Sequence, residues 1–354
     1  MEIDIQNGIK DYKMEKRKKT FFIIILIIGI IVFGSIAITI GPLNITVIEV
    51  YRVILHKILP SFINSVDSNI ENVVWLVRIP RILTSLLVGF CLAIAGAVMQ
   101  PVLRNPMASP FTLGISSGAG FGAAIAIIFG KSIAKGSFHV IANAFVFSLI
   151  TSFIILILSR KKGTTPESMI LIGIALSHLF TAGTTVMQYF ADSWATAEVV
   201  FWMVGSLSKG TWETLKYIFP VAIICIPFLI IKSWELNSIS AGDDAAKSLG
   251  VNVDKTRIIL MIVASLITAT TICFTGAIGF IGLIAPHITR MIGGGDNRFV
   301  IPAAGLVGAL LLSLSDMIAM NILEPIIIPI GVMTSFTGVP LFIFLIMKSR
   351  RRCL

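Results

Sequence analysis

The segment formed by residues 82–103 most constrains the fold, because its 22 residues include no charged side chain. A helix rises about 1.5 Å per residue, so a segment of this length crosses the roughly 30 Å hydrocarbon core of a bilayer. Further apolar runs recur along the chain between turn and charge signals. The ten predicted spans are residues 21–40, 82–103, 109–129, 138–158, 168–190, 213–231, 258–275, 278–292, 299–320 and 326–347. The sequence therefore predicts an all-α polytopic membrane protein with about ten transmembrane helices.

Composition and the distribution of charge agree with this prediction. Charged residues make up 13% of the chain, against about 25% in soluble domains, and the mean hydropathy is +0.96. If the N-terminus lies inside, 20 of the 28 lysines and arginines fall on the inner side of the spans. This asymmetry accounts for the net charge of +10 without a nucleic-acid partner. We expect a multi-pass protein in contact with the lipid of a cell membrane, with both termini in the cytoplasm.

Little of the chain remains for a soluble domain. Residues 1–20 are polar and basic and are expected to form a disordered cytoplasmic tail, and residues 348–354 form a second basic tail. The transmembrane domain thus covers residues 21–347. The outer segment 41–77 is too short for a core of its own, and residues 198–208 are typical of a short interfacial or re-entrant helix.

The inner loop 233–257, between the sixth and seventh spans, carries the pattern of two short helices. Its apolar residues recur at roughly helical spacing: Leu236, Ile239, Ala246 and Leu249. Gly242 and Gly250 are predicted to break the helices, and Asn237 and Asp243 are polar residues of the same segment. An apolar stripe favours docking into the groove of a partner. The alternative is that the loop folds onto the inner face of its own chain.

Two further segments are predicted to bend the chain. Asn105 and Pro106 form a polar hinge at the inner end of the second span. Gly279 and Gly282 permit a tight turn and close helix contact, and Pro286 kinks the helix that follows. His287, beside that kink, is expected to satisfy backbone carbonyls that the proline frees.

No catalytic or metal-binding constellation is evident. The cysteines lie in predicted spans or the inner tail, the histidines are scattered, and no spacing indicates a metal site or cofactor. Gly130-Lys131-Ser132 resembles the end of a phosphate-binding loop, but Ile125 occupies the position where that pattern requires glycine. The chain is therefore not expected to be an enzyme.

Polar residues in the spans indicate a transport path or interhelical contacts. Four of them form one helical stripe in the fifth span: Ser177, Thr181, Thr184 and Gln188. Asp316 lies in the ninth span, where an unpaired charge costs about 2.5–3.5 kcal/mol, and must face protein or water. Arg78 and Arg81 flank the second span at its outer end, where they either anchor the interface or bind acidic groups of a partner.

Several of these segments resemble the FecCD family, the BtuC-like permeases of ABC importers for iron-siderophores, haem and cobalamin. The resemblance rests on motifs at 78–81, 104–106, 236–250, 276–290 and 331–340. It implies a BtuC-like fold, a second permease copy or paralogue, separate cytoplasmic ATPases and an extracytoplasmic substrate-binding protein. It further implies that the inner loop 233–257 docks into the ATPase, that Arg78 and Arg81 meet glutamates of the binding protein, and that the fifth span lines the path.

The cargo that this resemblance implies first is a ferric siderophore, with haem, cobalamin and oxyanions as alternatives. Many members carry an outer arginine where this chain has Met320 and Asn321, so docking on that side is expected to differ. A proton-coupled secondary transporter that uses Asp316 is the alternative from another functional class. Such a carrier would not need the amphipathic inner loop 233–257.

Overall fold

The computed structural model describes residues 2–41, 43, 45–59, 67–160, 165–323 and 326–349, and helices are the regular structure of these ranges. The elements in chain order are α1 (Glu2–Thr39), α2 (Val47–Ile58), α3 (Ser68–Asn72), η1 (Val73–Arg78), α4 (Ile79–Val102), α5 (Ile115–Phe129), η2 (Gly136–Phe138), α6 (His139–Arg160), α7 (Pro166–Phe190), α8 (Ser193–Met203), α9 (Trp212–Ile231), α10 (Ser233–Ser240), α11 (Asp243–Ser248), α12 (Val253–Thr275), α13 (Ile281–Gly293), α14 (Asn297–Asn321) and α15 (Ile330–Ser349).

Each of the ten predicted spans coincides with one helix, which confirms the all-α prediction: α1, α4, α5, α6, α7, α9, α12, α13, α14 and α15. Seven helical segments among the described residues are long and apolar enough to cross a membrane by themselves. The helices α5 and α13 are shorter, with 15 and 13 residues. The prediction that α5 starts at residue 109 is wrong, because Gly114 adopts a left-handed backbone with φ +78° and the helix begins after it.

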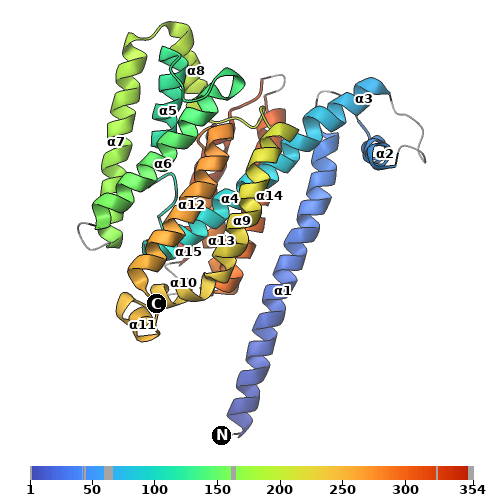
Figure 1. Ribbon diagram of the computed structural model, residues 1–354. Coiled ribbons are helices and arrows are strands. Elements are labelled where there is room, and N and C mark those ends of the chain that lie inside the picture. The colour runs from blue at the N-terminus through green and yellow to red at the C-terminus, as the bar shows by residue number, and fades with distance from the viewer. Residues whose placement is uncertain are drawn as a thin grey trace.

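The centre of the bundle is α4, which packs against α12, α13 and α14 (Figure 1). Of its 24 residues, 18 are buried. Glycine brings the helix backbones into direct contact, since a Cβ at Gly89 would lie 2.4 Å from the carbonyl oxygen of Gly308, and one at Gly96 would lie 1.7 Å from that of Gly282. Glycines thus bring the backbone of α4 into direct contact with the backbones of α13 and α14.

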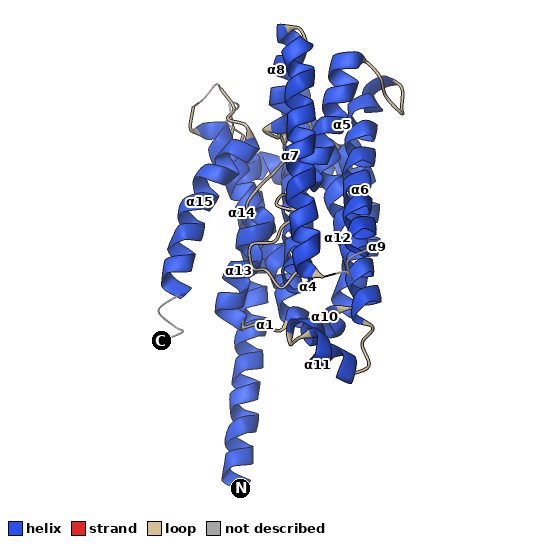
Figure 2. Cartoon of the chain, turned by 90° about the vertical axis from the view of Figure 1, so that its left-hand side faces the viewer, coloured by secondary structure: helices blue, strands red, loops and turns tan. Residues whose placement is uncertain are grey.

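Helices α1, α6 and α7 lie at the periphery, and at most 39% of the apolar window of each is buried inside the protein. Figure 2 shows α1 and α15 on one side of the molecule and α5 and α6 on the other, with the first residues of α1 at the same end as α10 and α11. We call this end the inner end and the opposite end the outer end. The N-terminal tail is helical from Glu2, so its predicted disorder is wrong. The second tail falls mostly outside the described residues, because residues 350–354 lie beyond them.

The outer segment forms a small apolar core, contrary to the expectation that it is too short for one. This core joins α2 to η1 and to the start of α4: Ile45, Val50, Val53, Val74 and Ile79. The core forms because α2, near the start of the segment, packs against η1, near its end. The short helix expected at 198–208 is also present, but α8 begins earlier, at Ser193, and ends at Met203.

Candidate functional site

The inner loop 233–257 forms two short helices, α10 and α11, as predicted. Gly242 separates them with φ +125°, and Gly250 follows α11 with φ +81°. A Cβ at either glycine would meet no atom within 4 Å, so their backbone conformation, and not crowding, favours glycine. The glycine breaks are therefore confirmed as the ends of the two helices.

The apolar stripe of this loop faces the chain itself. Leu236, Ile239 and Ala246 are fully buried, and Ile239 and Ala246 form a cluster with Val251 and Val253. The alternative in which the loop folds onto its own inner face is therefore the one that the structure adopts for these three residues. A groove of a partner is not needed to cover them, and their role in coupling stays a prediction.

The opposite face of α11 is available to another molecule. Leu249 is 57% exposed, and the side chains of Asp244 and Lys247 are also exposed at the inner end. The helix thus combines one apolar residue with two opposite charges on a surface that the chain does not cover. Of the predicted stripe, only Leu249 contributes to this surface.

Asp243 connects α11 to the bundle through two arginines. Its Oδ1 accepts a hydrogen bond from Nη2 of Arg257 at 2.9 Å and one from Nη2 of Arg104 at 2.5 Å. Arg257 is 1% exposed, and its Nε also donates to the carbonyl oxygen of Val102 at 3.2 Å. Arg104 adopts φ +47°, which is uncommon for a residue with a side chain. Sequence reasoning named Asp243 as a site residue and placed both arginines at the inner end, but it did not predict that they pair with Asp243.

Asn237 joins α10 to the start of α14. Its Nδ2 donates to Oδ1 of Asp296 at 2.8 Å, and its Oδ1 accepts from the backbone nitrogen of Asn297 at 2.8 Å. The Arg298 guanidinium donates to the Asp296 carboxylate and, with the bond from Asn237, lowers the pKa of this carboxyl to about 2. Asp296 therefore stays ionised and holds both elements at neutral pH.

The predicted hinge at the end of α4 is a hydrogen-bonded turn. Asn105 Oδ1 accepts from the backbone nitrogen of Met107 at 2.8 Å, and the backbone nitrogen of Asn105 donates to the carbonyl of Gln100 at 3.0 Å. Pro106 is exposed beside it. This turn places Arg104 next to α11, so the hinge residues support the contact with Asp243.

The carbonyls near Pro286 in α13 are contacted by Gln100, and not by His287 as expected. Pro286 frees the carbonyl of Gly282 four residues earlier, and Gln100 Nε2 lies 3.5 Å from that oxygen and 3.3 Å from the carbonyl of Leu283. The His287 Nε2 is buried and lacks a hydrogen-bond partner among the described residues. The long amide of Gln100 reaches the carbonyls from α4 across the helix contact.

The turn before α13 places Gly279 beside Phe111 and contains an unusual residue. Phe280 adopts φ +66°, and a Cβ at Gly279 would still be 3.9 Å from the Phe111 ring. The side chain of Phe280 leaves no room at Gly338, because a Cβ added to Gly338 would lie 2.8 Å from the Cβ of Phe280. The strained phenylalanine, missed by sequence reasoning, thus sets the contact between this turn and α15.

Arg78 and Arg81 are buried at the outer end, with 7% and 8% of their surfaces exposed. Arg78 donates to the carbonyl oxygens of Ile38 and Thr39 at 2.8 Å each, and also to that of Leu43. It therefore caps the C-terminal end of α1, where a cation is favoured by the helix dipole. Both guanidinium groups are thus engaged within the chain, and their docking role stays a prediction.

Arg81 forms a two-bond ion pair with Asp316. Its Nε donates to Oδ2 at 2.9 Å and its Nη2 to Oδ1 at 2.8 Å, and the side chains are only 9% and 6% exposed. The pair joins α4 to α14 and neutralises the charge that the sequence places within a span. Asp316 thus faces protein, which is one of the two surroundings that the sequence analysis allowed for it. Nearby, Asn321 donates from Nδ2 to the carbonyl of Met317, beside Met320 at the end of α14.

The four polar residues of α7 do not share one exposed face. Thr181 is exposed, whereas Thr184 is buried and donates to the carbonyl of Phe180 at 2.8 Å. Ser177 is half-buried against Gly114, where an added Cβ would lie 2.5 Å from its Oγ, and Gln188 is half-buried near the end of the helix. Helical spacing predicted one common side of α7, but the chain buries Thr184 and partly buries Ser177 and Gln188 on that side.

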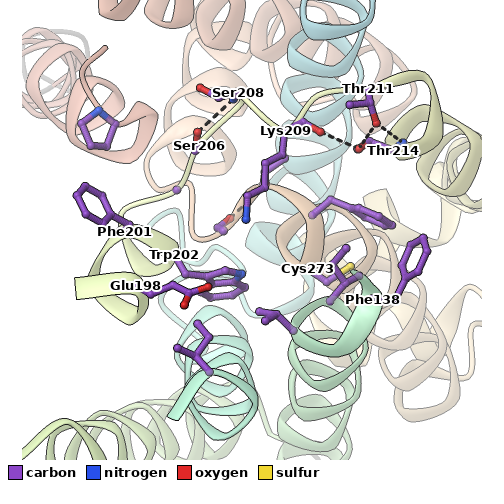
Figure 3. A pocket seen from close by; sticks show the side chains of 18 of the residues that line it. Phe138, Glu198, Phe201, Trp202, Ser206, Ser208, Lys209, Thr211, Thr214 and Cys273 are labelled. Atoms are coloured by element: carbon purple, nitrogen blue, oxygen red, sulfur yellow. Dashed lines mark hydrogen bonds between the residues drawn. The ribbon is translucent and has the colours of Figure 1, made fainter. Parts of the chain in front are cut away.

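A cavity of about 490 Å³ opens between α8, the 204–211 segment, α9 and the end of α12 (Figure 3). Lys209 extends into it toward Trp202, and Glu198 lies beside this ring. In the wall of the cavity, the backbone nitrogen of Ser206 donates to the carbonyl of Thr275 at 2.7 Å, so the 204–211 segment lies against the end of α12. The glycine-rich motifs indicated close contacts here, but the cavity itself was not predicted.

Comparisons with known proteins agree with this architecture. The model of the FecCD transport family matches residues 25–348. A protein of Methanocaldococcus jannaschii, provisionally described as an ABC transporter permease, is 43% identical over 96% of this chain and 98% of its own length. An Fe(3+)-citrate import system permease protein of Bacillus subtilis is 34% identical over 96% of this chain and 98% of its own length.

A solved structure is similar over nearly the whole fold. It is an inward-facing conformation of an ABC transporter, provisionally described as metal-chelate type, with a TM-score of 0.81 and 32% sequence identity. The match covers 92% of this chain and 98% of the other. Because the family model and these relatives span most of the chain, the chain belongs to the FecCD transport family.

Proposed function

We propose that this chain is the permease subunit of an ATP-driven importer for ferric chelates, most simply ferric siderophores. Two permeases, identical or paralogous, form the path; two cytoplasmic ATPases bind the inner end, and a substrate-binding protein delivers cargo at the outer end. Hydrolysis of ATP belongs to the separate ATPases. The inner end with α10 and α11 faces the cytoplasm, as the positive-inside distribution of lysine and arginine favours.

The observation that carries this proposal is the exposed face of α11. A helix that is joined to the bundle through the partly exposed Asp243 carboxylate, and is followed directly by Leu249 at 57% exposure, is suited to take up the movement of a bound partner. A carrier driven by protons has no use for such a surface. The exposed face of α11 is therefore the contact that we assign to the ATPase.

The test is capture of the cognate ATPase by membranes that contain this chain. Leu249→Asp is expected to weaken capture by at least about 10-fold, because it places a charge in the apolar centre of the contact. Leu43→Asp is the matched control, since Leu43 is 53% exposed at the opposite end and should not affect capture. Equal capture by both variants, or none by the wild type, would remove the ATPase contact from α11.

The cargo is tested by uptake of radiolabelled iron into cells that depend on this importer. Ferric citrate and ferric hydroxamates should be taken up and compete with each other, with haem, cobalamin and molybdate as the alternative substrates. The Fe(3+)-citrate permease and the metal-chelate type transporter support the ferric class. Competition by molybdate alone would contradict it.

A proton relay through Asp316 is the weaker alternative. Both carboxylate oxygens of Asp316 accept hydrogen bonds from Arg81, so this side chain is already engaged in a structural contact between α4 and α14. If Asp316 carried protons, Asp316→Asn would abolish the pH dependence of uptake while the protein stayed folded. We expect instead that this variant lowers the amount of folded protein.

A further inference from the structure

Helix α2 lies outside the bundle at the outer end and presents three distinct sides. Successive residues turn by about 100° around a helix, so the side of each residue follows from its position. Val50 and Val53 face the small outer core and are buried. On the same side, Lys57 pairs with Glu71 at 2.5 Å. One side of α2 is therefore fixed against its own chain.

The second side is apolar and exposed. Its residues span about a third of the helix circumference: Val47, Ile48, Tyr51, Leu55 and Ile58. Their exposed fractions include 71% for Ile48 and 65% for Ile58. We call these residues the apolar side of α2. A soluble surface rarely exposes so much contiguous apolar area on one short helix.

The third side is polar and contains Glu49, Arg52 and His56. Glu49 also accepts hydrogen bonds from the backbone and side chain of Thr46, which begin the helix and lower the pKa of this carboxyl. An apolar side next to a polar side, with the remaining side on protein, is the pattern of a helix that lies in a membrane interface.

The orientation of the apolar side follows from one hydrogen bond. The Tyr51 hydroxyl lies 2.8 Å from Oγ of Ser35. Ser35 lies one turn inward from Thr39, the last residue of α1, which is about 6 Å along the helix axis. A residue at the middle of the apolar side thus reaches back toward the bilayer, so this side points to the lipid and the polar side to water.

The neighbouring surface continues this apolar side. On α1, Ile31 is 61% exposed and Val32 is 53% exposed, one turn farther inward than Ser35. In Figure 1, α2 is seen nearly end-on while α1 runs down the page, so the two helices cross. The lipid-facing surface of α1 therefore passes directly onto the apolar side of α2.

We propose that α2 is an interfacial anchor whose apolar side lies among the lipids of the outer leaflet. The partner is the lipid surface itself, and the anchor holds the small outer core at the level of the bilayer. Through η1 this core carries Arg78, which caps α1. The lipid contact therefore stabilises the arrangement of α1 and α4 at the outer end.

The experiment measures the depth of single spin labels in the full-length chain reconstituted in phospholipid nanodiscs. Labels are placed at Leu55 and Ile48 on the apolar side, at Arg52 on the polar side, and at the exposed Ile28 of α1 as a lipid reference. Cys353→Ser removes the cysteine of the tail, and the other three cysteines are buried. Collision rates with oxygen, which enriches in lipid, and with a water-soluble nickel chelate give the depth.

We expect the ratio of oxygen to nickel collisions at Leu55 and Ile48 to exceed that at Arg52 by at least about 5-fold and to approach that of Ile28. Nickel accessibility at Leu55 equal to that at Arg52 would place α2 in water and overturn the proposal. Protection of Leu55 from both reagents would show a protein cover instead of lipid and would also overturn it. The result does not depend on ATPase binding or on cargo.

Discussion

At the outer end of the bundle two arginines join membrane-spanning helices to one another, whereas at the inner end two arginines join a short helix to the bundle. The outer pair, Arg81 with Asp316, is less than 10% exposed and links α4 to α14. At the inner end, the Asp243 carboxylate is 31% exposed and is shared by Arg104 and Arg257. Both contacts are ion pairs between arginine and aspartate, but the outer pair is buried in protein whereas the inner carboxylate is partly exposed to water.

The difference assigns different tasks to the two ends. A buried ion pair is strongly disrupted when one partner is lost, because the remaining charge stays in a low-dielectric site. A partly exposed carboxylate is screened by water, so its contacts can be lengthened at smaller cost. We therefore expect α1, α4 and α14 to move as one unit at the outer end, while α11 can shift relative to the bundle when a partner moves it.

The largest expected effect is on the outer ion pair. Arg81→Ala should lower the free energy of unfolding by about 3–5 kcal/mol, because it leaves the Asp316 carboxylate buried without its partner. The measurement is the midpoint of thermal unfolding in a matched lipid or detergent. Arg52→Ala, an exposed arginine on α2 at the same end, should change stability by less than about 0.5 kcal/mol.

A double variant sharpens this result. Arg81→Met combined with Asp316→Leu removes both charges and should recover most of the stability lost by Arg81→Ala. If the double variant is as unstable as the single one, packing around the guanidinium, and not the unpaired carboxylate, determines the loss.

The next effect is expected at the inner end. Asp243→Ala should lower the free energy of unfolding by about 1.5–3 kcal/mol, because Arg257 is buried and loses its carboxylate partner. It should also reduce the stimulation of ATP hydrolysis by cargo, measured with the purified transporter. Asp254→Ala is the control, since this acid in the first turn of α12 is exposed and lies outside the α11 face assigned to the ATPase. Equal effects of the two variants would contradict the role of Asp243.

A smaller loss of stability is expected from a change at Gln100, near the inner end of α4. Gln100→Leu should cost about 1–2 kcal/mol, because it removes the amide near the carbonyls of Gly282 and Leu283 and the acceptor of Arg290. Gln188→Leu, at the half-buried end of α7, should cost less than about 0.5 kcal/mol. Thermal unfolding measures both, and a Gln100→Leu protein as stable as the wild type would show that the kink needs no support from α4.

The smallest effect concerns pH. Arg298 holds the pKa of Asp296 at about 2, below its ordinary value of 3.8, so this contact stabilises the fold above pH 4 and is lost as the pH falls toward 2. Arg298→Ala should cost less than about 1 kcal/mol between pH 5 and 8, because Arg298 is largely exposed. The difference in unfolding midpoint between the two proteins should be constant there and shrink below pH 4. A difference that grows on acidification would contradict this assignment.

Sequence reasoning predicted the spans because an apolar run of sufficient length has few alternatives in a membrane. It also predicted the ends of α10 and α11, since glycine at Gly242 and Gly250 breaks a helix locally. It did not predict which molecule covers Leu236, because periodicity indicates that one side of a helix is buried but not by what. The pairing of Arg81 with Asp316 joins residues 235 positions apart, and no local pattern specifies it.

That same separation constrains how the protein is made. Ribosomes add about 5–20 residues per second, so roughly 12–47 s pass between the synthesis of Arg81 and that of Asp316, 235 residues later. During this interval the guanidinium must keep water or lipid headgroups as its partners, because an unpaired charge is costly in the hydrocarbon. The outer end of α4 therefore remains at the membrane surface until α14 arrives. The central helix of the bundle reaches its final depth only when the penultimate spanning helix has been inserted.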